Sequence, residues 1–164
     1  MIYDPSFRTA FLAWQLAQAM APRLERALRP LDLTLAQQNA LVLVALVPGI
    51  SCAEVARRCG ITAQSMGAAV NALMGRGLLE RQPHPTNRRV MQLHITQEGR
   101  ELAERAQELM AAVDAEADNV FSPEELATAQ AVLRRMVERL NPDALRFGAA
   151  PSAPRPVPGG EPEA

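Results

Sequence analysis

The stretch "SCAEVARRCGITAQSMGAAVNALMGRGLLER", residues 51–81, decides the fold of this chain. Ser51 and the acid three residues after it form a capping-box pattern, which predicts the start of a short helix. Gly60 suits the left-handed position that follows a helix end, and Thr62 is a good N-cap for a second helix over residues 63–75. Two helices joined by a short glycine turn have the spacing of a helix-turn-helix.

The residues after Gly77 change from a helical to an alternating pattern. The runs "LLERQP" (78–83) and "RVMQLHI" (89–95) flank a tip that contains Pro and Asn, so they predict the two strands of a hairpin. A helix-turn-helix followed at once by a hairpin is a winged helix. Its second helix can lie in the major groove of DNA.

Helical apolar patterns continue before and after this unit. Residues 5–29 carry an apolar side chain at every fourth position, which predicts a long helix that Pro22 should kink. Thr34 and Gln37 form a second capping box and predict a helix over residues 35–46.

Two further helices are expected after the hairpin. Thr96 is the N-cap of a long helix, and Ser122 with Pro123 marks the start of the last one. The terminal helices offer more apolar surface than one small domain needs, which favours a homodimer. The alternative is that they pack on one another within one chain. Residues 146–164 are rich in Pro, Gly and Ala and predict a disordered tail.

Charge and composition narrow the function. The net charge is only −1, but residues 51–96 carry six Arg against two acids. Such a basic segment can mark a polyanion-binding face. The alternative is that these arginines are ordinary solvent-exposed charges. No apolar run is long enough to cross a bilayer, the N-terminus does not resemble a signal peptide, and two cysteines make no disulfide framework. We therefore expect a cytoplasmic protein with no membrane partner.

The predicted fold class is mainly α with a small β-wing: a winged helix-turn-helix with N- and C-terminal dimerisation helices. The predicted parts are an N-terminal dimerisation helix (1–33), the winged helix-turn-helix DNA-binding domain (34–96), C-terminal dimerisation helices (97–145) and the tail (146–164).

The second helix of the helix-turn-helix should offer its N-terminal residues to base edges. Gln and Asn can pair bidentately with adenine, and Arg at the hairpin tip suits the minor groove. The candidate DNA-binding residues are Ser51, Thr62, Ala63, Gln64, Ser65, Gly67, Ala68, Asn71, Arg88 and Arg89. Gly67 either lets the helix backbone approach DNA closely or is simply a tolerated small residue.

Other kinds of site are poorly supported. Cys52 and Cys59 favour core packing, no Cys/His cluster has zinc-ligand spacing, and no catalytic or phosphate-binding motif stands out. We therefore expect no metal, no cofactor and no enzymatic activity. Phe11, Trp14 and Gln18 on the first helix are candidates for an effector pocket, with dimer core as the alternative for Trp14.

Residues 33–99 resemble the MarR family of winged-helix transcriptional regulators. The resemblance rests on "LTLAQQNALVLVAL", on the stretch quoted first, and on "HPTNRRVMQLHITQEG". The family's wing pattern is Asp-Pro-x-Asp-x-Arg, and here it is His84-Pro85-Thr86-Asn87-Arg88-Arg89. The flanking helices extend the resemblance to about residues 5–145.

The resemblance implies a homodimer that binds a pseudo-palindromic operator and usually represses nearby genes. A small aromatic or phenolic effector, bound between the dimerisation helices and the winged domain, would release the DNA. Arg89 takes the place of the family's wing arginine. Ala68 and Ala72 stand where many members carry Arg, and His84 and Asn87 replace the two acids of the wing pattern. These departures leave open a rival reading: a protein-interaction or small-molecule-binding module with little specific DNA affinity.

Overall fold

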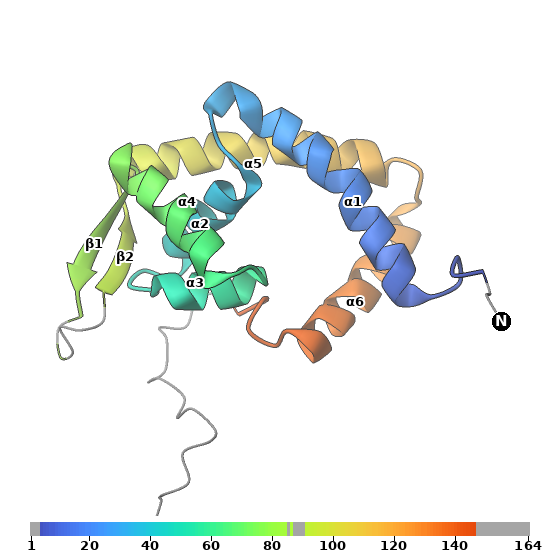
Figure 1. Cartoon of the computed structure of the whole chain (residues 1–164). Helices are drawn as coiled ribbons and strands as arrows, with labels where there is room; N and C mark the ends of the chain where they lie inside the picture. The colour runs from blue at the N-terminus through green and yellow to red at the C-terminus, as the bar shows by residue number, and fades with distance from the viewer. Residues whose placement is uncertain (1–3, 85, 87–90, 147–164) are drawn as a thin grey trace, which may run out of the picture.

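The computed structural model describes residues 4–84, 86 and 91–146 (Figure 1). The elements are α1 (Thr9–Leu28), the 3₁₀ helix η1 (Arg29–Leu31), α2 (Leu35–Leu46), α3 (Cys52–Cys59), α4 (Ala63–Gly75), β1 (Leu79–Pro83), β2 (Met91–Ile95), α5 (Gln97–Asp118) and α6 (Pro123–Leu140). The predicted fold class, mainly α with a small antiparallel hairpin, is confirmed. The tail from residue 147 onward lies outside the described residues, so its predicted disorder stays a prediction.

Side-chain caps fix most helix starts where the sequence predicts them. Thr34 and Ser122 each close a reciprocal capping box, with Gln37 and Glu125 respectively. The box predicted at Ser51 is only half formed. Its hydroxyl accepts the Glu54 amide over 3.2 Å, but the Glu54 carboxylate turns to arginines of its own helix instead of returning to Ser51.

The first helix starts later than predicted. The carboxylate of Asp4 accepts the Ser6 amide over 2.8 Å, and the Pro5 carbonyl accepts the Arg8 amide, so the chain makes a turn here. An Asp side chain that bonds the backbone two residues on favours such turns over helix. The start at residue 5 was therefore wrong, and α1 begins at Thr9.

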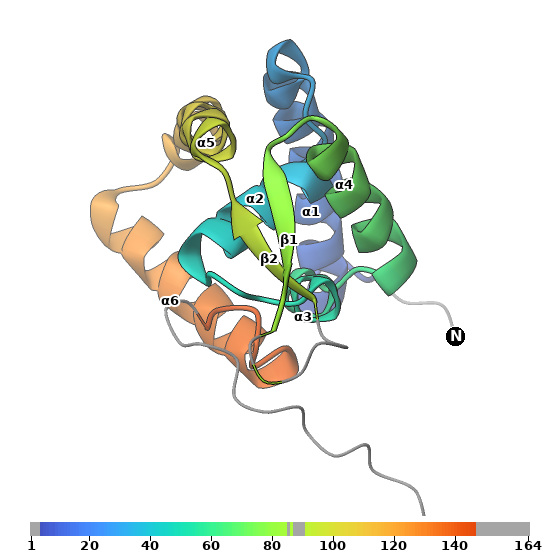
Figure 2. The same ribbon diagram turned by 90° about the vertical axis from the view of Figure 1, so that its left-hand side faces the viewer.

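The hairpin is antiparallel, with Leu79 opposite Ile95 and Arg81 opposite Leu93, and it projects beside α4 (Figure 2). The segment before α3 also pairs with β2: the Gly49 amide donates to the Leu93 carbonyl over 3.0 Å, and the Leu93 amide donates to the Ile50 carbonyl over 2.9 Å. These two bonds fix the hairpin to the helix-turn-helix.

The buried core lies in the winged helix-turn-helix and reaches into the first half of α5. Its largest fully buried apolar side chains come from α1, α2, α4, β2 and the α2–α3 connection: Leu28, Leu41, Ile50, Met66, Leu73 and Leu93. Ala103 and Ala106 of α5 close the cluster. The end of α1 and the first half of α5 therefore complete the core of the winged unit within one chain.

The outer helices are different. In α1, Leu28 is the only buried residue. The structure describes every residue of α6, and none of them is buried. The exposed large apolar residues of α1, α5, α6 and the connection between α5 and α6 are Leu12, Trp14, Leu16, Leu109, Val120, Phe121, Val132, Leu133, Val137 and Leu140. Among the described residues, no helix combines the length and apolarity needed to span a bilayer.

Candidate nucleic-acid interface

Helix α4 divides into a buried and an exposed face. Met66, Val70 and Leu73 are buried in the core of the winged unit. Gln64, Ser65, Ala68 and Asn71 are exposed, as is Ala72, so the face turned away from the core has the predicted polar and small residues. No residue of Ala63–Gly75 carries a charge, so any charged grip on a polyanion must come from neighbouring segments.

The start of α4 is built around Thr62. Its Oγ1 accepts the Ser65 amide over 3.1 Å and its hydroxyl donates to Ser65 Oγ over 2.8 Å. The remaining free amides of the first turn give a helix N-terminus a partial positive charge, which favours nearby phosphate. Ser51 is the corresponding N-cap of α3 and is half-buried.

Gly67 lies in the middle of α4 and is not required by packing. A Cβ added there would meet nothing within 4 Å outside the helix itself. A glycine in a helix interior costs about 1 kcal/mol relative to alanine. Gly67 thus lowers the stability of α4 without any contact in this chain that explains it.

The hairpin contacts α4 through Arg81. Its Nη2 donates to Asn71 Oδ1 over 3.2 Å, so the base of the hairpin and the exposed face of α4 form one surface. The predicted wing contacts Arg88 and Arg89 lie outside the described residues, and their roles stay predictions.

A cavity of about 550 Å³ adjoins this unit between α2, α3 and α5. Polar and apolar residues line it in nearly equal number: Gln38, Asn39, Val42, Leu43, Arg58, Cys59, Gln107, Met110, Ala111, Asp114 and Ala144. This volume and mixed lining are typical of small-molecule sites.

Two buried polar side chains give the cavity its chemistry. Gln38 is 1% exposed; its Nε2 donates to the Ala103 carbonyl over 3.2 Å, and its Oε1 has no hydrogen-bond partner in the described part of the chain. A buried acceptor without a partner costs free energy that a ligand donor could recover. Arg58, 7% exposed and paired with Glu54 over 2.8 Å, places a guanidinium at the same cavity.

Cys59 also lines the cavity, and burial raises the pKa of its thiol. A raised thiol pKa means less thiolate at neutral pH, and therefore a less reactive cysteine. Cys59 and Cys52 are both half-buried and pack against the core, as the sequence indicated.

The effector residues predicted on the first helix lie elsewhere. Phe11 and Trp14 form a tilted aromatic pair with ring centroids 6.3 Å apart, and Trp14 is 56% exposed. Neither they nor Gln18 belong to the cavity lining. Sequence reasoning missed Gln38 and Arg58. The signal for Gln38 was a glutamine on the core-facing side of an otherwise apolar helix, "LAQQNALVLVAL".

Comparison with known proteins agrees with the resemblance seen in the sequence. The MarR family model matches residues 31–90. Over 134 residues the chain is 31% identical to the HTH-type transcriptional repressor Rv2887 of Mycobacterium tuberculosis (strain ATCC 25618 / H37Rv). That alignment covers 81% of this chain and 93% of the relative.

Solved structures show the same fold. CouR from Rhodococcus jostii RHA1, bound to p-coumaroyl-CoA, aligns with a TM-score of 0.74 at 23% identity, over 85% of this chain and 96% of that one. Mycobacterium tuberculosis Rv2887 in complex with DNA aligns at 0.62 and 28% identity, over 80% and 96%. The same protein in complex with salicylic acid aligns at 0.64 and 30% identity, over 80% and 95%.

Proposed function

The chain belongs to the MarR family, and from this premise we propose that it is a homodimeric DNA-binding transcriptional repressor controlled by a small aromatic acid. The observation that carries the proposal is the exposed face of α4. It presents Gln64, Ser65 and Asn71 to solvent beside the hairpin, while the opposite face of α4 is buried in the core. The relative Rv2887, at 31% identity, is a transcriptional repressor, and its structures include one with DNA.

In this role α4 enters the major groove and the hairpin follows the backbone. Gln64 and Asn71 read adenine edges through their amide groups, and Ser65 donates or accepts. Arg89, with Arg88, enters the minor groove beside it, where negative potential favours arginine. Because α4 has no charge of its own, we expect the wing arginines to supply most of the phosphate and minor-groove attraction.

A second copy of the chain covers the apolar surface of the outer helices. The exposed apolar residues of α1, α5 and α6 belong to segments with few buried side chains, so they contribute little to the core of one chain. A two-fold dimer would set two α4 helices about 34 Å apart, one turn of DNA, and match a pseudo-palindromic operator.

The effector site is the cavity between α2, α3 and α5. An aromatic ring fits its apolar walls, a hydroxyl can donate to Gln38 Oε1, and a carboxylate can pair with Arg58. We choose salicylate as the first probe because the structure of Rv2887 with salicylic acid aligns with this chain at 30% identity. This regulatory role needs no catalytic group, so we propose no enzymatic activity.

The test is fluorescence anisotropy on duplex DNA from upstream of the chain's own gene, with a scrambled duplex as control and genomic fragment selection if that site fails. Specific, salt-sensitive binding is expected. Arg89→Ala should weaken it on every sequence and lower the salt slope by about one per site. Gln64→Ala should instead change preference at one base pair, by about 1–3 kcal/mol.

Salicylate should then release the operator complex. If the protein binds its operator specifically but salicylate does not release it, the proposed effector class is wrong and the proposed repressor function is unaffected. Binding no tighter than to scrambled DNA, with no fragment enriched in the selection, would favour the rival reading of an interaction or ligand-binding module without useful DNA affinity.

A further inference from the structure

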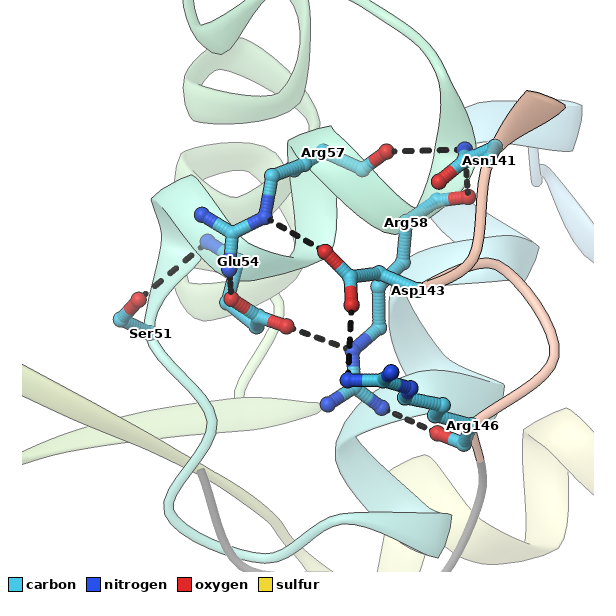
Figure 3. A network of polar contacts seen from close by, with 7 residues as sticks. All are labelled: Ser51, Glu54, Arg57, Arg58, Asn141, Asp143 and Arg146. Atoms are coloured by element: carbon cyan, nitrogen blue, oxygen red, sulfur yellow. Dashed lines mark hydrogen bonds and ion pairs between the residues drawn. The ribbon is translucent and has the colours of Figure 1, made fainter. Parts of the chain in front are cut away.

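Six side chains from two distant parts of the chain meet where the end of α6 reaches α3 (Figure 3). Glu54, Arg57 and Arg58 come from α3, and Asn141, Asp143 and Arg146 come from the segment after α6. Asp143 lies between two arginines: its Oδ2 is 3.3 Å from Arg57 Nε and its Oδ1 is 3.2 Å from Arg146 Nη1. We call residues 141–146 the C-terminal latch.

Asn141 caps the end of α3 from outside that helix. Its Nδ2 donates to the carbonyl of Arg57 over 3.2 Å and to the carbonyl of Arg58 over 3.4 Å. The last carbonyls of a helix have no partner within the helix. The Arg57 carbonyl also accepts the Gly60 amide over 3.2 Å, so the bond from Asn141 matters most for the Arg58 carbonyl. Asn141 is itself the C-cap residue of α6, so one side chain joins the ends of two helices.

Arg58 makes the latch necessary to α3. Its side chain is 5% exposed, its Nε donates to Glu54 Oε1 over 2.8 Å, and its Nη1 donates to the backbone carbonyl of Arg146. A buried guanidinium needs acceptors for its donors, because an unpaired buried charge is strongly destabilising. The latch provides one of the two recorded acceptors.

The latch matters because α6 has little else to hold it to its own winged unit. None of its residues is buried, and its apolar side chains belong to the surface that we assign to a second copy. Helix α3, by contrast, packs against α4 and contributes Val55 and Ala56 to the core. These contacts give a route by which a displacement at the end of α6 would reach α3 and, through α3, α4.

We propose that the C-terminal latch couples the dimerisation helices to the helix-turn-helix by fixing the end of α3. The coupling to DNA rests on the proposed repressor function, whereas the latch itself does not. Arg58 and Ala144 both line the cavity, so a ligand there contacts α3 and the latch together. An occupant that drew Arg58 away from the Arg146 carbonyl would release the latch end.

Asn141→Asp tests the latch with a nearly isosteric change, because it places a carboxylate oxygen where an amide donor faced two carbonyls. Asn119→Asp is the matched control: Asn119 is the C-cap of α5 and is exposed. Both variants put a negative charge at the C-terminus of their own helix, so the control accounts for that part of the dipole cost. Asp143→Asn is a milder second variant, in case Asn141→Asp does not fold.

The first readout is hydrogen–deuterium exchange of the full-length dimer without DNA, followed in peptides covering residues 52–60. Asn141→Asp should speed exchange there about tenfold, and Asp143→Asn should speed it less, at unchanged dimer mass. Exchange equal to that of Asn119→Asp would overturn the latch, whether or not the protein binds DNA.

The second readout is DNA binding by the same variants. If the latch positions α3 and α4, Asn141→Asp should change operator affinity several-fold while Asn119→Asp does not. Faster exchange in α3 with unchanged operator affinity would overturn the coupling. Absence of DNA binding in the wild-type chain would instead contradict the proposed function and leave the exchange result to decide on the latch.

Discussion

Arg81 on β1 donates a hydrogen bond from Nη2 to Oδ1 of Asn71 on α4, over 3.2 Å. Within the described residues this is the one side-chain hydrogen bond of Asn71, so its Nδ2 can still donate and its amide oxygen keeps a second lone pair. Bidentate pairing with adenine needs both of these groups. Arg81 therefore orients Asn71 before DNA arrives and links the hairpin to the proposed recognition helix.

Arg81→Ala should loosen base preference at the position that Asn71 reads. We expect Asn71→Ala to abolish that preference, worth about 1–3 kcal/mol. Arg81→Ala should reduce it partly and also weaken binding to all sequences through loss of a charge. Anisotropy on operators with single base substitutions measures both effects. An equal loss on every operator after Arg81→Ala would mean that Arg81 contacts only the DNA backbone.

Local chemistry explains why α2, α3 and α4 were predicted to within about one residue. Each of these helices starts at a Ser or Thr whose hydroxyl accepts the backbone amide three residues later. Gly60, with a φ of 66°, ends α3 as expected. The latch and the cavity could not be predicted in this way. Arg57 and Asp143 are 86 residues apart in sequence, and Gln38 bonds a carbonyl 65 residues away. Only the packed chain brings these partners together.

The sequence also misassigned one side chain for a physical reason. The spacing of Ser51 and Glu54 fits a capping box, yet Glu54 pairs with Arg57 and Arg58. A buried arginine competes more strongly for a carboxylate than an amide at a helix start does, because its charge has no alternative partner in water. The same competition helps to build the latch.

Gly67→Ala should separate stability from DNA binding. The added Cβ meets nothing within 4 Å outside the helix, so the free energy of unfolding should rise by about 1 kcal/mol. If the glycine serves close approach of the helix backbone to DNA, operator affinity should fall in the same variant. Urea unfolding and anisotropy measure the two quantities. Higher stability with unchanged affinity would leave Gly67 as a tolerated small residue.

Gly99→Ala should damage the joint between the hairpin and α5. A Cβ at Gly99 would lie 2.1 Å from the Leu78 carbonyl oxygen. The same oxygen accepts a hydrogen bond from the Thr96 hydroxyl over 3.1 Å. The backbone must move to make room, and we expect a loss of about 3 kcal/mol in the free energy of unfolding. Gly75→Ala is the control, because a Cβ there meets nothing within 4 Å. Similar stability of the two variants would contradict the close approach.

Cys59 should be a slow nucleophile whose reactivity reports on the cavity. Burial raises the pKa of its thiol, so below that pKa a smaller fraction is thiolate than in a free cysteine, and the deficit disappears only at higher pH. In a Cys52→Ser background, alkylation by iodoacetamide should therefore be slower than that of free cysteine at pH 7–8. It should still be rising where free cysteine has levelled off, above a pH of about 9.

Because Cys59 lines the cavity, a bound occupant should slow its alkylation further. The unfolded chain in urea provides the control, since it should lose both the low reactivity and the protection. Alkylation as fast as that of free cysteine at neutral pH would show that the thiol is not held half-buried at the end of α3. The assignment of the cavity as a ligand site would then be wrong.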